Sequence, residues 1–135
     1  MTIPEIYDRL LTAWNDGDAA RAAALFAPDG LMVDFDGSQA VGADIAARPG
    51  IPDGARHVAK IRAVRGNVLH AITGVVPAGG FDVDPALNAV QTVVVQDGLI
   101  VLFQSTPARY KGRPDLAASH NAELMPALLT GEIFA

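Results

Sequence analysis

Apolar residues near the N-terminus recur at helical spacing. Thr2 and Glu5 form a capping-box pattern that begins a helix. The apolar positions that follow fall on one helix face and are Ile3, Ile6, Tyr7, Leu10, Leu11 and Trp14. Asp18 is placed to cap a second helix over residues 18–26, which the sequence PDG at residues 28–30 ends.

From Leu31 onward the hydrophobic period changes from helical to alternating, which predicts strands. Residues 31–35 and 38–41 flank Asp36 and Gly37, a dipeptide typical of a two-residue hairpin turn. A short helix is predicted over residues 43–47. Four further strands are predicted over residues 57–65, 68–77, 89–96 and 99–107, and a closing helix from Pro114 to about Met125.

Helices followed by a hairpin and a four-strand meander predict an α+β domain rather than alternating βαβ units. We expect one domain over residues 1–135, with a curved, antiparallel or mixed sheet of six strands wrapped as a cone around the N-terminal helices. Residues 118–135 would form a C-terminal helix and tail. The apolar tail residues cap the cone or cross to a partner subunit: Leu128, Leu129, Ile133 and Phe134.

Composition and charge exclude several classes of function. The net charge of −5 argues against nucleic acid and anionic membranes as partners, because both need a basic surface. The chain has no cysteine, which excludes thiolate chemistry and cysteinyl metal sites. No signal peptide or membrane-spanning run is visible, so we expect a cytoplasmic protein. No ligand spacing indicates a metal site, and we expect no cofactor.

Several motifs point to a known superfamily. The sequences WNDGD at residues 14–18 and ALFAPDG at residues 24–30, followed by a hairpin, resemble the nuclear transport factor 2-like, or SnoaL-like, superfamily. Four later motifs resemble its SgcJ/EcaC subgroup: HAITGVVP at residues 70–77, NAVQT at 88–92, FQSTP at 103–107 and GRP at 112–114. The resemblance implies a cystatin-like cone whose members include isomerases, polyketide cyclases, dehydratases and binding modules. The chain lacks GxGxxG, so an oxidoreductase activity is not supported.

Asp34 is the best candidate for a general base. A turn at Asp36 and Gly37 would set it opposite Gln39 and beside Met32 and Val41, on an apolar face that disfavours the charged carboxylate. The resemblance places Asp34 at the general-base position of ketosteroid isomerase. It also places Leu10 where that enzyme has a tyrosine donor, so steroid isomerisation does not carry over. The alternative is that Asp34 is a turn residue bonded to the hairpin backbone.

Two glutamines are candidates for substrate binding. A turn at Asp97 and Gly98 would set Gln91 directly opposite Gln104, on a face shared with aliphatic residues. Two amides in such a wall either orient a ligand's carbonyl or hydroxyl group or bond to each other. Asn88 and Trp14, which lie in the motifs quoted above, complete the predicted substrate-binding set.

His70 is a candidate acid or hydrogen-bond donor. A turn at Gly66 and Asn67 would set it on one face with His57, Ala59, Ile61, Ile72 and Gly74, where small residues leave room for a cavity. The alternative is a structural histidine. The opposite face would be a half-apolar outer surface suited to a homodimer and formed by Val58, Lys60, Arg62, Val64, Leu69, Ala71, Thr73 and Val75.

These features predict a cofactor-independent isomerase, cyclase or dehydratase that moves a proton on a polyketide-like or other apolar, oxygenated metabolite. Asp34 would be the base, His70 an acid or donor, and Gln91 and Gln104 the orienting residues. The substrate class comes from the resemblance. The alternative is a non-catalytic, dimeric ligand-binding or accessory protein for a biosynthetic pathway, which a cone filled by Trp14, Phe26 and Phe103 would favour.

Overall fold

The computed structural model describes residues 1–48, 54–84, 87–107 and 132–134. Its helices are α1 (Ile3–Asn15), α2 (Ala19–Ala23) and the 3₁₀ helix η1 (Gly42–Ala47). Its strands are β1 (Phe26–Val33), β2 (Gln39–Val41), β3 (Arg56–Arg65), β4 (Val68–Val76), β5 (Ala89–Gln96), β6 (Leu99–Pro107) and β7 (Glu132–Phe134). The predicted closing helix lies outside the described residues.

Both N-terminal helices begin where the sequence predicts. The hydroxyl of Thr2 accepts a hydrogen bond from the Glu5 backbone N–H at 3.3 Å, and the Asp18 carboxylate accepts one from the Arg21 N–H at 2.9 Å. The second helix ends at Ala23, three residues before its predicted end, because Phe26 already belongs to β1. The short helix predicted over residues 43–47 is confirmed as η1.

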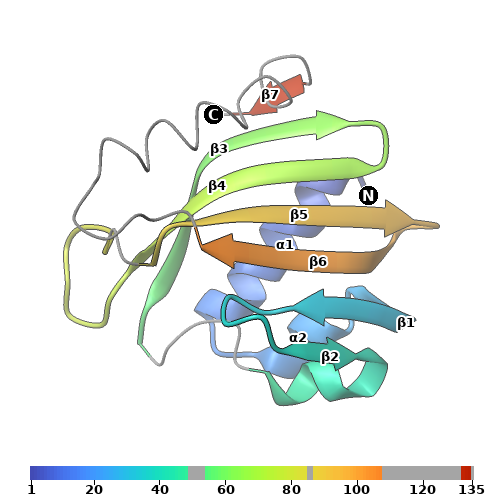
Figure 1. Ribbon diagram of the computed structural model, residues 1–135, viewed down its shortest axis with the longest axis horizontal. Helices are drawn as coiled ribbons and strands as arrows, with labels where there is room; N and C mark the ends of the chain where they lie inside the picture. The colour runs from blue at the N-terminus through green and yellow to red at the C-terminus, as the bar shows by residue number, and fades with distance from the viewer. Residues whose placement is uncertain (49–53, 85–86, 108–131, 135) are drawn as a thin grey trace.

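The strands form one mixed, curved sheet in the order β2-β1-β6-β5-β4-β3-β7 (Figure 1). β1 runs parallel to β6, and the other neighbours are antiparallel. The predicted α+β class and the curved mixed sheet are therefore confirmed. The described sheet has seven strands rather than six, because residues 132–134 of the tail add β7 to the edge of β3, with Ala63 opposite Ile133.

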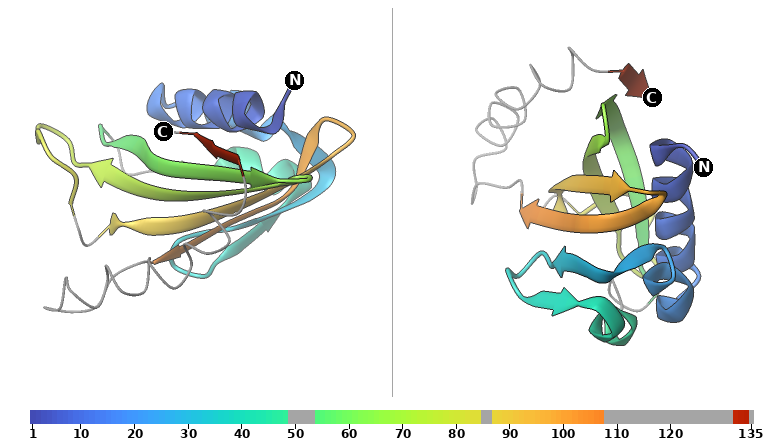
Figure 2. Two further views of the ribbon diagram at one scale, coloured as in Figure 1. Left: turned by 90° about the horizontal axis from the view of Figure 1, so that it is seen from above. Right: turned by 90° about the vertical axis from the view of Figure 1, so that its right-hand side faces the viewer.

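One face of the sheet, the inner face, packs against α1 (Figure 2). The main core lies between them and includes Leu10 and Trp14 of α1 and Leu69, Ala71 and Val93 of the sheet. The assignment of faces in β4 is therefore the reverse of the prediction. Leu69, Ala71, Thr73 and Val75, expected on an outer surface, are buried on the inner face. Alternation separates the two faces of a strand but does not say which of them the helix covers. The homodimer stays a prediction.

Two bulges change the predicted register. In β3 the pairing shifts between Ala59 and Ile61, so His57 lies opposite Val75 and leaves the face that carries His70. Between β5 and β6 the pairing shifts between Val94, which lies opposite Leu102, and Val95, which lies opposite Ile100. An extra residue in one strand of a pair sends every later side chain to the other face.

Among the described residues, no helix has both the length and the apolar character needed to cross a membrane.

Gly42 is fixed by a close backbone approach. Its φ is +58°, and a Cβ there would lie 2.4 Å from the Pro28 carbonyl oxygen. Gly66 has nearly the same φ, +60°, but nothing within 4 Å of its Cβ position. We expect Gly42→Ala to lower the free energy of unfolding by about 1–3 kcal/mol more than Gly66→Ala, since the two differ only in overpacking. Urea denaturation of both variants measures this difference, and equal losses would contradict it.

Candidate functional site

The inner face carries a buried polar pair, Tyr7 and Gln91. The Tyr7 hydroxyl, from α1, donates a hydrogen bond of 2.6 Å to the Gln91 side-chain oxygen, from β5. The two side chains are 0% and 1% exposed. Desolvation raises the pKa of Tyr7 well above its ordinary value, against a smaller lowering by Arg62. Tyr7 is therefore a neutral donor that holds Gln91 in one orientation.

The space around this pair is filled by aromatic side chains. The rings of Trp14 and Phe103 meet edge to face at 5.0 Å between centroids, and the Trp14 ring lies 5.9 Å from that of His57. Trp14, Phe26 and Phe103 are all buried in the main core. Trp14, predicted to bind substrate, is a packing residue in this arrangement. An interior filled by these side chains is expected of a binding or structural protein rather than of an enzyme that has a deep active-site cavity.

Gln104 does not face Gln91. The bulge in β6 sets Gln91 opposite Ser105 and Thr92 opposite Gln104, so the predicted pairing of the two glutamines is wrong. Gln104 is exposed on the outer face, whereas Gln91 is buried on the inner face. The two amides therefore cannot bind one ligand from the same side of the sheet.

His70 lies on the outer face, in a row with Thr92 and Gln104 across β4, β5 and β6. Its Nδ1 is 3.1 Å from the Thr92 hydroxyl oxygen. Partial burial lowers the pKa of His70 below its ordinary value, because desolvation disfavours the imidazolium. The structure thus places His70 and Gln104 on the outer face, whereas Gln91 lies on the inner face.

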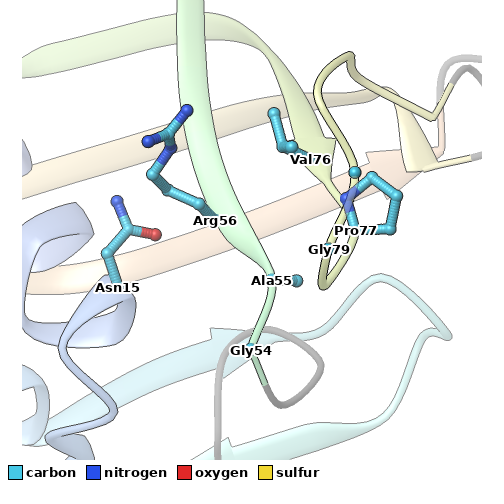
Figure 3. Close-up of a pocket in the computed structure, with 8 residues that line it drawn as sticks. Asn15, Gly54, Ala55, Arg56, Val76, Pro77 and Gly79 are labelled. Carbon is cyan, nitrogen blue, oxygen red and sulfur yellow. The ribbon is translucent and has the colours of Figure 1, made fainter.

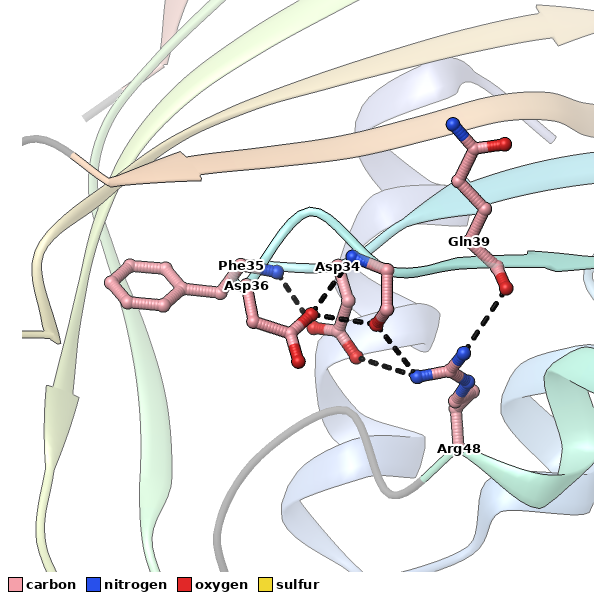
Figure 4. A network of polar contacts seen from close by, with 6 residues as sticks. Asp34, Phe35, Asp36, Gln39 and Arg48 are labelled. Carbon is pink, nitrogen blue, oxygen red and sulfur yellow. Dashed lines mark hydrogen bonds and ion pairs between the residues drawn. The ribbon is translucent and has the colours of Figure 1, made fainter.

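Asp34 lies in the hairpin between β1 and β2, which differs from the predicted one. Val33 pairs with Gln39, so the loop is longer than the two-residue turn and Asp34 is opposite Ser38. The Asp34 carboxylate accepts a hydrogen bond of 2.8 Å from the Phe35 N–H and lies 3.8 Å from an Arg48 guanidinium nitrogen (Figure 4). Its side chain is 26% exposed. The expected apolar surroundings are replaced by a backbone donor and a cation.

The rest of this hairpin network is polar and solvent-facing. The hydroxyl and backbone N–H of Ser38 both donate to the Asp36 carboxylate, at 2.6 Å and 2.9 Å, and hold the pKa of Asp36 below its ordinary value. Arg48 donates to the Ser38 hydroxyl at 2.8 Å and to the Gln39 carbonyl at 3.1 Å. These contacts hold the loop around Arg48. They agree with the alternative in which Asp34 is a turn residue bonded to the hairpin backbone.

A pocket of about 320 Å³ lies at the end of the sheet where β4 ends and β3 begins (Figure 3). We call this end the mouth. The residues that line the pocket are Asn15, Gly54, Ala55, Arg56, Val76, Pro77, Gly79 and Gly80. Arg56 and Val76 lie opposite each other in the β3–β4 pair. Asn88, half-buried just before β5, belongs to the same end of the sheet.

Asn15 joins α1 to this pocket. Its side-chain oxygen accepts a hydrogen bond of 2.7 Å from the His57 N–H, and its amide nitrogen donates to the His57 carbonyl at 3.2 Å. Sequence reasoning did not select Tyr7, Asn15 or Arg56. Tyr7 belongs to the apolar face predicted for the N-terminal helix, but its hydrogen-bond partner Gln91 is 84 positions away in the sequence. Asn15 lies in the motif WNDGD at residues 14–18, but its neighbours do not indicate a role for its side chain, and nothing in the local pattern marks Arg56.

The Tyr7–Gln91 bond has a measurable cost of removal. Tyr7→Phe leaves the buried Gln91 oxygen without its donor, so we expect a loss of about 1–3 kcal/mol in the free energy of unfolding, partly restored by adding Gln91→Leu.

The raised pKa of Tyr7 also predicts how the stability of the protein changes at alkaline pH. Above about pH 10 the unfolded chain releases this proton first, so the wild type loses stability relative to Tyr7→Phe as the pH rises. Denaturation at pH 8 to 11 tests both effects, and parallel curves would refute the second.

Comparison with known proteins identifies the fold. No family model and no curated protein sequence matches the chain. Among solved structures, a cystatin-like domain of unknown function from Nostoc punctiforme is 18% identical, with a TM-score of 0.69 over 96% of this chain and 95% of that one. A nuclear transport factor 2-like protein of unknown function from Mesorhizobium loti is 23% identical, with a TM-score of 0.59 over 76% and 88% of the two chains.

A candidate ketosteroid isomerase from Kribbella flavida is 19% identical, with a TM-score of 0.63 over 83% of this chain and 84% of that one. The SgcJ/EcaC subgroup stays a prediction. Together with the curved mixed sheet and the helix on its inner face, these likenesses show that the chain has a cystatin-like, or nuclear transport factor 2-like, fold, which is the fold that the sequence resemblance implied.

Proposed function

We propose that this protein binds a small, largely apolar metabolite with oxygen-bearing groups in the pocket at the mouth. The observation that carries the proposal is the pocket itself, in which the polar side chains of Asn15 and Arg56 lie beside apolar ones. Ala55, Val76 and Pro77 offer the apolar surface. Arg56 offers hydrogen-bond donors to a ligand's oxygen atoms.

The packed interior supports binding at the mouth rather than deep inside the sheet. Trp14, Phe26 and Phe103 fill the space between α1 and the inner face, and the Gln91 oxygen is already bonded to Tyr7. The predicted acid and base, His70 and Asp34, lie on the outer face and in the β1–β2 hairpin. This dispersal favours a ligand-binding or accessory protein over an enzyme that uses those groups together.

Filling the pocket with a larger side chain should weaken ligand binding. We expect Val76→Trp to weaken the binding of the neutral bicyclic ketone 1-indanone about tenfold or more, which is a loss of about 1.4 kcal/mol, because the indole would occupy the pocket. The measurement is titration followed by amide NMR shifts, with the wild-type shifts expected at Ala55, Arg56 and Gly79.

The matched control is Val68→Trp. Val68 is half-buried like Val76 and lies at the opposite end of the same strand, opposite Arg65. This variant should bind 1-indanone as the wild type does. A wild type whose amide shifts concentrate elsewhere, or a Val76→Trp variant that binds normally, would contradict the proposed site.

A second candidate function is proton transfer by an isomerase, cyclase or dehydratase on a polyketide-like or similar ketone. The likeness to the candidate ketosteroid isomerase favours it, as does the position of Asp34 at the mouth. The ends of β1, β6 and β4 lie together because β1 is parallel to β6, and β5 runs antiparallel between β6 and β4. β6 and β5 lie between β1 and β4, so the distance from β1 to β4 across the sheet is roughly 15 Å. A ligand in the pocket would have to extend across the mouth to reach Asp34.

Deuterium exchange tests this candidate directly. If Asp34 is a base, the protein should speed the exchange of the α-hydrogens of 1-indanone in D₂O, and Asp34→Asn should reduce that enhancement about 100-fold or more. Asp36→Asn is the control, since Asp36 is a carboxylate of the same hairpin that is bonded to Ser38. If the wild type exchanges the α-hydrogens of 1-indanone no faster than buffer does, the catalytic hypothesis is refuted and the binding proposal stands.

A further inference from the structure

The mouth pocket holds a cation that the described protein does not neutralise. Three other arginines contact carboxylates: Arg21 with Asp16, Arg48 with Asp34, and Arg62 with Asp8. Among the described residues, no carboxylate forms an ion pair with Arg56, which is the first residue of β3 and is exposed at the pocket. Its guanidinium is therefore available to an anionic group from outside.

Among the described residues, no second charged side chain lines the pocket. Arg56 is the only charged residue among the eight described residues that form the walls, in a chain whose net charge is −5. Among these eight residues, a carboxylate entering the pocket would meet one cation and no anion. A planar guanidinium also matches the two oxygens of a carboxylate through paired hydrogen bonds.

Asn15 supplies a second, fixed donor beside Arg56. Its oxygen and one amide hydrogen are used by the backbone of His57, which holds the amide plane in place. The second hydrogen on the amide nitrogen is not used in these bonds. Figure 3 shows the Asn15 amide and the Arg56 guanidinium on the same side of β3. A ligand oxygen held by Arg56 can thus accept a hydrogen bond from Asn15 as well.

The wall of the pocket opposite Asn15 and Arg56 is apolar and closely packed. Val76 and Pro77 face the pocket, and the turn that follows is closed by a hydrogen bond of 2.9 Å from the Gly80 N–H to the Pro77 carbonyl. A Cβ at Gly54 would lie 3.0 Å from that of Ala78. This wall offers contact to a hydrocarbon or aromatic body, and its side chains offer no hydrogen-bond donor.

We propose that the mouth pocket recognises small carboxylic acids with an apolar body, and that Arg56, assisted by Asn15, binds the carboxylate. The inference rests on the proposed function, because it assigns a ligand class to the same pocket. It makes Arg56 the specificity-determining residue. The apolar body lies against Val76 and Pro77.

The test compares 2-naphthoate with its neutral counterpart 2-naphthamide by amide NMR titration of the full chain. In the wild type we expect naphthoate to bind about tenfold more tightly than naphthamide, as a charge-assisted pair predicts. Arg56→Gln should remove that preference, because naphthoate loses a charge-assisted pair whereas naphthamide loses only a neutral hydrogen bond. Arg65→Gln is the matched control, because Arg65 is an exposed arginine at the other end of β3 and should keep the preference.

The outcomes separate this inference from the proposed function. Equal binding of the two compounds at the pocket, or a preference that survives Arg56→Gln, would overturn the assignment of Arg56 and leave the pocket as a binding site. Equal losses in Arg56→Gln and Arg65→Gln would also overturn it, since they would indicate a general charge effect. If neither compound shifts Ala55 or Gly79, both proposals fail.

Discussion

The packing of α1 on the inner face of the sheet is the constraint on which the rest of this structure depends. Apolar burial supplies most of the attraction, through residues such as Ile6, Leu10 and Trp14. Two polar contacts set where the helix lies. The Tyr7–Gln91 bond fixes its middle against β5, and the Asn15 amide fixes its end against the backbone of β3. Hydrophobic contact has no direction, whereas these bonds tolerate little displacement.

The position of the helix also decides where a ligand can lie. A helix seated this closely leaves aromatic rings packed against the inner face, and the pocket lined by described residues lies at the mouth. Asn15 belongs to both arrangements, since it anchors α1 and lines the pocket. A ligand bound at the mouth, as proposed, would therefore be coupled to the position of α1 through the side chain of Asn15.

Much of this fold could be predicted from sequence because its signals are local. The stripe of apolar residues in α1 and the alternation in β5 and β6 gave the element bounds, and β5 and β6 agree at both ends with the prediction. The bulges at residues 60 and 101 carry no local signal, and each one separates two residues that were predicted to share a face. The first separates His57 from His70, and the second separates Gln104 from Gln91. The partner of Tyr7 is equally invisible, because it depends on how α1 crosses the sheet.

The edge of β3 has a consequence for the behaviour of the chain in concentrated solution. A long, flat edge strand invites pairing with another molecule. Here β7 pairs with residues 62–64 of β3, and a bulge interrupts the strand at residue 60. The Asn15 amide bonds to the N–H and the carbonyl of His57, as the backbone of a neighbouring strand would. At the other border of the sheet, β2 is only three residues long. Neither border of the described sheet therefore offers the uninterrupted ladder on which β-aggregation starts.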